Sequence, residues 1–163
     1  MIRCGTVLSS TSATSAAKDK TLLDELKKAL NILKMQQPDI DLWERGLILP
    51  GMDSKQEIST HINQAHLILL LLSPDFLASK QCREEMELAA KKRDLGETYV
   101  IPILLRHVAW EDTAIGKLEP LPKDGRPISG RPMDDREKVV KEIAKYIRQV
   151  IDKIRQDLSK KDS

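Results

Sequence analysis

Aromatic side chains and cysteines are both scarce in this sequence. Phe, Trp and Tyr together make up 3% of the 163 residues, and the two cysteines, Cys4 and Cys82, form no repeated spacing. Two isolated thiols are typical of a reduced intracellular protein rather than of a disulfide framework. The three histidines, His61, His66 and His107, are scattered and form no cluster of zinc ligands. We therefore expect no metal site and no bound cofactor.

A surplus of charge of one sign is also absent. Lys and Arg number 27 and Asp and Glu number 25, which leaves a formal net charge of +2. Such a balance provides no basic footprint for nucleic acid or for an anionic membrane surface, and we expect neither partner. The longest apolar run is far shorter than the ~20 residues that cross a bilayer, and no signal peptide is evident. These absences predict a cytoplasmic protein.

The sequence does contain enough apolar residues, 40% of the total, for a chain of this length to bury one core. We expect a single domain over residues 1–160. Small polar residues at 9–17 predict a flexible loop, and residues 159–163 are expected to form a disordered tail.

Hydrophobic periodicity predicts an alternation of strands and helices within this domain. Strands are expected near residues 1–8, 40–43, 67–72 and 99–105, and helices near residues 19–36, 53–65, 78–95 and from 134 onward. Pro102 removes one backbone donor from the last strand and predicts an edge position or a bulge there. This alternation is typical of an α/β, flavodoxin-like fold with a parallel sheet and helices on both faces.

One glutamate lies on the apolar face of its predicted helix. The run Leu67–Leu72 suits a strand buried on both faces, and the helix after it carries three glutamates. With a rotation of ~100° per residue, Glu85 falls inside the apolar stripe around Cys82, whereas Glu84 and Glu87 project toward solvent. A carboxylate facing the interior is unfavourable unless it is paired, protonated or lines a cleft. Glu85 is therefore the candidate functional residue.

Two explanations of Glu85 stay open at this point. The carboxylate could end the apolar stripe and pair with a lysine or arginine, which is a purely structural role. Alternatively, it could lie at the mouth of the crevice beyond Leu72, where open α/β sheets place their ligands. There it could bind a sugar hydroxyl or stabilise an oxocarbenium-like centre as a glycosidic bond breaks.

Several local patterns together resemble a TIR (Toll/interleukin-1 receptor) domain of the bacterial kind. Ser79, Cys82 and Glu85 resemble the serine–cysteine–glutamate signature that opens a helix in this family. The remaining similarities cover the second strand, the BB loop, the helix after it, the third strand, the fourth strand and the loop beyond, at residues 41–45, 48–51, 53–65, 67–76, 100–104 and 116–122. The resemblance extends over roughly residues 18–155.

The resemblance implies a flavodoxin-like three-layer sandwich with a central five-stranded parallel sheet and helices on both faces. It also implies an NAD+ glycohydrolase, since many bacterial and plant TIR domains cleave the nicotinamide–ribose bond to give nicotinamide and ADP-ribose or a cyclic isomer. Glu85 occupies the position of the essential glutamate, which is expected to hold the ribose hydroxyls and offset positive charge at the anomeric carbon. NAD+ is then a substrate rather than a cofactor, and the reaction requires no metal.

The family position of other residues implies contacts with the substrate. In the BB loop, Ile48, Pro50 and Gly51 would cover the pocket. The other positions implied to contact the substrate are Ser10, Trp43, Ser79 and Cys82, although Cys82 by itself is typical of a small buried packing residue. The resemblance further implies that the domain associates with itself or with other TIR domains, and that this assembly activates it in bacterial defence or signalling.

The alternative function is a non-catalytic TIR module that mediates homotypic assembly in signal transduction. Gln81 stands where an aromatic residue often precedes the cysteine of this family, and Ser54 stands where tryptophan is frequent. The loop after the first strand also lacks the family's aromatic and basic groups. Each missing aromatic removes a stacking surface for adenine or nicotinamide worth ~1 kcal/mol, which favours the module.

Overall fold

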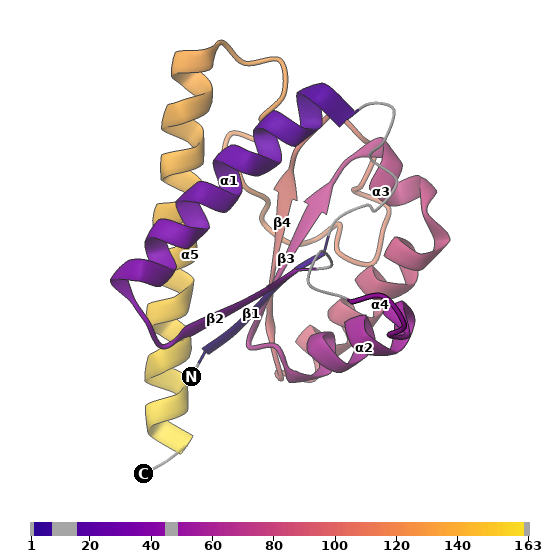
Figure 1. The fold of residues 1–163 in the computed structure, drawn as a ribbon, viewed down its shortest axis with the longest axis vertical. Helices are drawn as coiled ribbons and strands as arrows, with labels where there is room; N and C mark the ends of the chain where they lie inside the picture. The colour runs from indigo at the N-terminus through magenta and orange to yellow at the C-terminus, as the bar shows by residue number, and fades with distance from the viewer. Residues whose placement is uncertain (1, 8–15, 45–48, 162–163) are drawn as a thin grey trace.

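The computed structural model describes residues 2–7, 16–44 and 49–161. Its strands are β1 (Ile2–Val7), β2 (Ile40–Glu44), β3 (Leu67–Leu72) and β4 (Tyr99–Leu104). Its helices are α1 (Ala16–Gln36), α2 (Ser54–Gln64), α3 (Pro74–Ala78), α4 (Lys80–Asp94) and α5 (Met133–Lys161). The predicted alternation of strands and helices is confirmed, and the short α3 is an additional element (Figure 1).

The described strands form one parallel sheet in the order β2-β1-β3-β4, so the sheet has four strands where the resemblance implied five. Beyond β4, Leu121 makes a single parallel bridge with Ile103 of that strand. Pro120 and Pro122 flank Leu121. Because proline fixes φ near −65°, whereas a parallel strand needs about −120°, this segment does not continue along β4.

The predicted edge position of the proline-containing strand is confirmed. β4 is the outermost of the four described strands on its side of the sheet. The carbonyl of Pro102 and the N–H of Leu104 both point outward, where each forms a 2.8 Å hydrogen bond with the backbone of Leu121. The missing N–H of Pro102 therefore faces the outer edge, and the ladder between β3 and β4 loses no donor.

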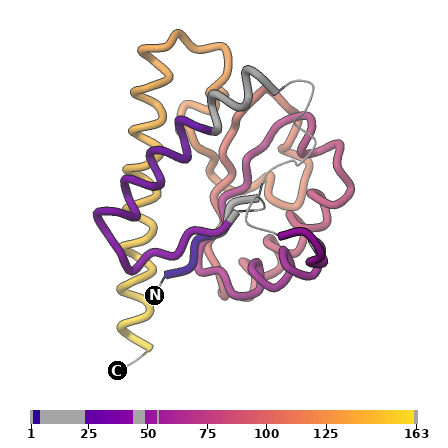
Figure 2. The backbone as a smooth tube through the Cα atoms, viewed as in Figure 1, coloured from indigo at the N-terminus to yellow at the C-terminus, as the bar shows by residue number. Residues whose placement is uncertain are grey.

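The central strand β3 separates two hydrophobic cores. Its six residues are all buried, with exposed fractions of 2% or less, as predicted for a strand covered on both faces. Leu67, Leu69 and Leu71 pack in the core under α1 and α5, whereas Ile68, Leu70 and Leu72 pack in the core under α2 and α4. Figure 2 shows the same division, with α1 and α5 on one side of the sheet and α2 to α4 on the other. The expected three-layer arrangement is confirmed.

Two helix ends follow from local sequence. Asp53 is the N-cap of α2, and its side chain accepts a hydrogen bond of 3.2 Å from the backbone N–H of Gln56. Gly96 ends α4 with φ of 75°, and the next N–H, that of Glu97, donates to the carbonyl of Lys92 at 3.0 Å. α2 begins and α4 ends within one residue of the limits predicted for these helices, 53 and 95.

Two expected irregular segments are in part helical. α1 begins at Ala16, so residues 16 and 17 belong to a helix rather than to the flexible loop expected at 9–17. α5 continues through Lys161, so residues 159–161 form its last turn instead of a disordered tail. The apolar stripe of α5 packs against the core under α1 and α5 as far as Leu158, and the backbone hydrogen bonds of the helix continue to Lys161. The remaining residues of both expected segments lie outside the described part of the chain.

His66 joins the start of β3 to β1. The backbone N–H of Arg3 donates to Nδ1 of His66 at 2.9 Å, and the backbone N–H of His66 donates to the carbonyl of Arg3 at 2.9 Å. Burial of the imidazole, followed by the positive charge of Arg3, lowers the pKa of His66 below its ordinary value of 6.5. The folded state therefore favours neutral His66 more strongly than the unfolded state does.

We expect acid to weaken the fold through His66. Because its folded pKa is lowered, the contribution of His66 to stability is present above the unfolded pKa and is lost as the pH falls through the folded pKa. The free energy of unfolding, measured in urea at about pH 7 and at about pH 5, should fall less in His66→Asn than in the wild type, since the amide oxygen accepts a hydrogen bond without titrating. His107→Gln, at an exposed histidine, is the control and should retain the wild-type pH dependence. An equal loss of stability in His66→Asn would contradict this assignment.

Candidate functional site

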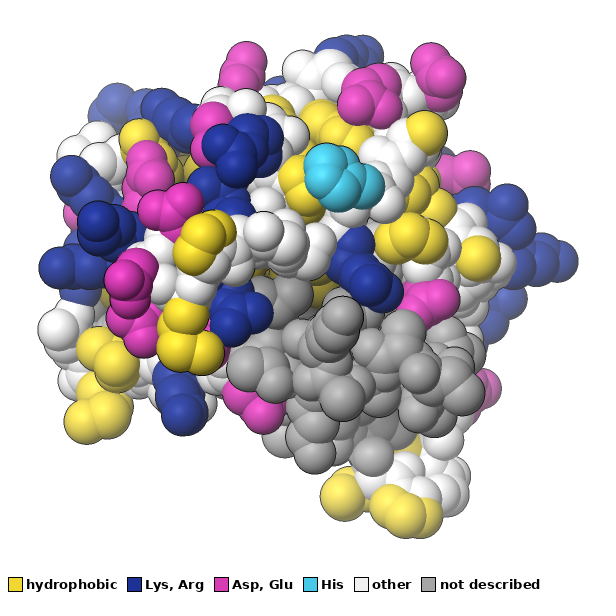
Figure 3. Space-filling model, turned by 90° about the horizontal axis from the view of Figure 1, so that it is seen from above, with side chains coloured by type: hydrophobic (Ala, Val, Ile, Leu, Met, Phe, Trp, Pro, Cys, Tyr) yellow, Lys and Arg dark blue, Asp and Glu magenta, His cyan; other side chains and the backbone are white. Residues whose placement is uncertain are grey.

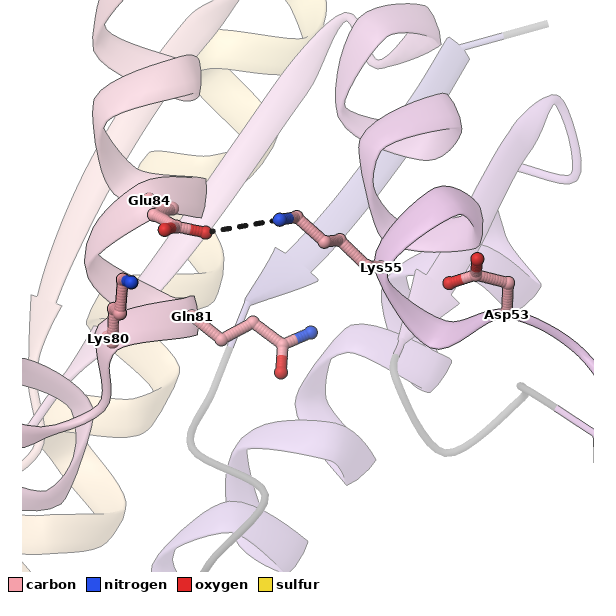
Figure 4. Close-up of a pocket in the computed structure, with 5 residues that line it drawn as sticks. All are labelled: Asp53, Lys55, Lys80, Gln81 and Glu84. Carbon is pink, nitrogen blue, oxygen red and sulfur yellow. Dashed lines mark ion pairs between the residues drawn. The ribbon is translucent and has the colours of Figure 1, made fainter.

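A hollow lies between the first turns of α2 and α4. These helices follow β2 and β3 along the chain, so their N-termini lie toward the carboxyl ends of the parallel strands, where open α/β sheets bind ligands. The hollow has a volume of about 510 Å³, which is within the range of ligand sites. We call it the α2–α4 hollow, and it is lined by Asp53, Lys55, Lys80, Gln81 and Glu84 (Figure 4).

Glu85 faces the protein interior, as its position on the helical wheel predicted. Its exposed fraction is 6%, and it is the one buried acidic residue in the part of the chain that the structure describes. On α4 it is surrounded in sequence by Cys82, Met86 and Ala89, which belong to the apolar core under α2 and α4. Glu85 does not line the α2–α4 hollow, although the preceding residue, Glu84, does.

The α2–α4 hollow contains an ion pair that sequence reasoning missed. Nζ of Lys55 on α2 lies 3.8 Å from a carboxylate oxygen of Glu84 on α4. The two side chains are 76% and 45% exposed, and exposed pairs of this kind contribute only ~0–1 kcal/mol to stability. The sequence shows Lys55 near the start of α2 and Glu84 near the start of α4, but their proximity depends on how the two helices pack.

Ser79 and Cys82 form the N-terminal cap of α4. Oγ of Ser79 accepts a hydrogen bond of 3.2 Å from the backbone N–H of Cys82, which satisfies one free donor of the first turn. Cys82 is 1% exposed and packs in the apolar core, in agreement with a packing role. Neither residue is among those that line the α2–α4 hollow, so their contact with a substrate stays a prediction.

Trp43 lies in a second hollow, which is formed by residues of β1, β2 and α2. Its ring stacks on His61 of α2, with 4.1 Å between ring centroids and an angle of 15° between the planes. Trp43 lines a smaller hollow of about 150 Å³, together with residues that include Arg3, Asp41 and Gln64. The structure therefore does not bring Trp43 into the α2–α4 hollow, and one face of the indole is already covered.

The described part of the BB loop ends in a tight turn. The N–H of Met52 donates to the carbonyl of Leu49 at 3.1 Å, and Gly51 has φ of 89°, a conformation that favours glycine. Pro50 and Gly51 are exposed, and the neighbouring Leu49 and Met52 are 64% and 46% exposed. These residues form an apolar tip directly before α2.

Two of the expected substrate contacts, Ser10 and Ile48, lie outside the described residues. Within residues 2–7, 16–44 and 49–161, no three or more His, Cys, Asp or Glu side chains are grouped so that they could hold a metal ion. Over the same ranges, none of the helices combines the length and the apolar character that crossing a membrane demands.

The end of the molecule seen in Figure 3 carries intermixed charges. This view looks from above onto the end toward which β3 and β4 point in Figure 1. Acidic and basic side chains alternate over the visible part of this face, and no broad region of one sign appears among them. On the visible part of this face, side chains of opposite charge therefore lie close to one another.

The comparisons with known proteins agree with this fold. Residues 13–138 match a family model described as TIR domain. The chain is 39% identical over 137 residues to the uncharacterized protein y4lF of Sinorhizobium fredii (strain NBRC 101917 / NGR234). That alignment includes 83% of this chain and 42% of the relative, so the chain spans less than half of the relative's length.

The structure is also similar to the crystal structure of the TIR domain of the Toll-related receptor TRR-2 from Hydra magnipapillata. The TM-score is 0.53 with 15% sequence identity, and the match covers 94% of this chain and 97% of that one. At this identity the likeness shows the fold, and the fold is that of a TIR domain. Because the family model matches well over half of the chain, the chain belongs to the TIR domain family.

Proposed function

We propose that this TIR domain is an NAD+ glycohydrolase that cleaves the nicotinamide–ribose bond and releases nicotinamide with ADP-ribose or a cyclic isomer. The observation that carries this proposal is the burial of Glu85, a single acidic side chain with 6% exposure among apolar neighbours on α4. The hollow of about 510 Å³ beside the first turn of the same helix provides room for a nucleotide.

The proposed chemistry uses the negative charge of Glu85. As the bond between the anomeric carbon and the nicotinamide nitrogen breaks, its electron pair moves to the pyridinium nitrogen and the nicotinamide leaves as a neutral molecule. Positive charge develops on the ribose, and a buried carboxylate attracts that charge more strongly than an exposed one would. Water then adds to the anomeric carbon and loses a proton, which gives ADP-ribose. Attack by a group of the ADP-ribose itself would give the cyclic isomer instead.

Self-association is the second part of the proposal. TIR domains in general associate with themselves or with other TIR domains and act in signal transduction. The exposed apolar tip at Leu49 and Met52 supplies a surface for such contacts. We propose that assembly of neighbouring domains activates hydrolysis, and that the protein serves defence or stress signalling in the cytoplasm by consuming NAD+ or by making a nucleotide messenger.

The second candidate is a non-catalytic interaction module. The lining of the α2–α4 hollow favours it, because the residues Asp53, Lys55, Lys80, Gln81 and Glu84 include no aromatic platform for adenine or nicotinamide. The exposed tip at Leu49 and Met52 suits both candidates.

Incubation of the purified protein with NAD+ separates the two candidates. We expect nicotinamide release, followed by chromatography, with a specific activity that rises with protein concentration because assembly activates the domain. Chromatography of the second product distinguishes ADP-ribose from a cyclic isomer. No release at any concentration, including after fusion to a domain that forces oligomerisation, would reject hydrolysis and favour the interaction module.

A further inference from the structure

We infer that the α2–α4 hollow binds the diphosphate group of a dinucleotide, and that Lys55 exchanges Glu84 for a phosphate oxygen when the ligand enters. The choice of a dinucleotide as ligand rests on the proposed function. The diphosphate site itself rests on the side chains of the hollow.

The two lysines of the hollow come from different helices and face the same space. Figure 4 shows Lys55 reaching from α2 toward Glu84 of α4, with Lys80 and Gln81 on the first turn of α4. Lysine ammonium groups are point charges suited to phosphate oxygens, and the amide of Gln81 offers further donors. The hollow also lies at the N-termini of α2 and α4, whose dipoles favour negative charge.

The formal charges of the residues that line the hollow balance one another. The lining residues include two lysines, Lys55 and Lys80, and two carboxylates, Asp53 and Glu84, which gives a formal sum of zero. Asp53 is engaged as the cap of α2, since its side chain accepts the backbone N–H of Gln56 at 3.2 Å. Glu84 is thus the carboxylate that competes directly with an incoming phosphate for Lys55.

The geometry of the Lys55–Glu84 pair permits the exchange. Its separation of 3.8 Å is longer than a direct hydrogen bond, and both side chains are substantially exposed, so little is lost when Lys55 turns away. A diphosphate offers Lys55 charge-assisted hydrogen bonds in return. Removal of the Glu84 charge should therefore strengthen binding, whereas removal of the Lys55 charge should weaken it.

The proposed diphosphate site and Glu85 share the helix α4. Glu84 and Glu85 are successive residues, separated by ~100° of rotation on the helix, and only Glu84 lines the hollow. A diphosphate held on the Glu84 side keeps the attached ribose close to α4, the helix that carries Glu85. We therefore assign Lys55 and Lys80 to substrate binding and Glu85 to the chemical step.

Calorimetric titration of the folded protein with ADP-ribose, inorganic pyrophosphate and adenosine tests the site. We expect Lys55→Met and Lys80→Met each to weaken ADP-ribose binding about tenfold, or ~1.4 kcal/mol, and Glu84→Gln to tighten it about threefold. Pyrophosphate affinity should change in the same directions. The affinity for adenosine, which has no phosphate, should stay within about twofold in every variant.

Matched controls lie elsewhere on α4. Lys91→Met and Glu87→Gln make the same chemical changes at exposed positions that do not line the hollow, and both should bind ADP-ribose like the wild type. Thermal unfolding of each variant verifies that it is folded. The inference is overturned if Lys55→Met and Lys80→Met leave ADP-ribose affinity unchanged, if Glu84→Gln weakens binding, or if the wild type binds no ADP-ribose.

The same variants separate this inference from the proposed hydrolysis. If the wild type releases nicotinamide but Lys55→Met and Lys80→Met leave ADP-ribose affinity unaltered, the diphosphate site is wrong and hydrolysis stands. If ADP-ribose and pyrophosphate binding depend on the lysines while no nicotinamide is released, hydrolysis is wrong and the diphosphate site stands.

Discussion

Glu85→Gln is expected to lower the rate constant for nicotinamide release about 10²–10³-fold, the size of effect seen when one preorganised electrostatic contact to a transition state is removed. Glutamine has nearly the same shape as glutamate, so it occupies the same buried position on α4. It lacks the negative charge that offsets the cationic ribose. We expect kcat to fall far more than KM changes, because the charge acts mainly when the bond breaks.

Glu87→Gln is the control for this experiment. It makes the same chemical change on the same helix, at an exposed position, and should leave kcat within about twofold of the wild type. Both variants should be compared at equal assembly state, since association is proposed to activate the enzyme. Turnover by Glu85→Gln at the wild-type rate would remove Glu85 from its catalytic role and leave its burial as a structural feature.

Leu69→Ala is expected to reduce the free energy of unfolding by about 3–4 kcal/mol, which is a large fraction of the stability of a typical domain. Leu69 is 0% exposed on the central strand β3, and it belongs to the core under α1 and α5 that includes Ile143 and Ile147. The substitution removes three carbon atoms and leaves a cavity between the sheet and the helices that cover it. Urea unfolding followed by circular dichroism measures this loss.

Ile32→Ala provides the comparison for Leu69→Ala. Ile32 lies on α1 and is 55% exposed, so its truncation should change the unfolding free energy by no more than about 0.5 kcal/mol. A cost below ~1 kcal/mol for Leu69→Ala would show that the core under α1 and α5 is less tightly packed than the structure indicates. The two substitutions together therefore measure burial rather than residue type.

Most secondary structure could be predicted because its causes are local. The six apolar residues of β3, the glycine at position 96 and the cap at Asp53 each specify an element or an end through neighbouring residues. The short helix α3 was missed because Ser73 and Ser79, only six positions apart, cap two successive helices, and a helix of five residues is too short to show periodicity. The resemblance implied a fifth strand, but the described sheet has four, and the prolines beside Leu121 limit that segment to one bridge with β4.

In the candidate site, too, some features could be predicted from local sequence and others depend on how the elements pack. The inward direction of Glu85 follows from the helical repeat of α4 and needed no knowledge of the partner elements. The pair formed by Lys55 and Glu84, and the stacking of Trp43 on His61, each join residues from different elements. No local pattern determines such distances.

The sequence by itself determined an alternating α/β chain with one inward-facing glutamate, because periodicity, capping and turn chemistry act between residues a few positions apart. The resemblance to TIR domains came from local motifs, and the family model confirmed it. Only the tertiary structure decided that Glu84 and Lys55 meet across a polar hollow while Glu85 lies outside its lining. The physical reason is that the relative position of α2 and α4 is set by the packing of the core beneath them, to which Ile58, Phe76 and Met86 from three different helices contribute.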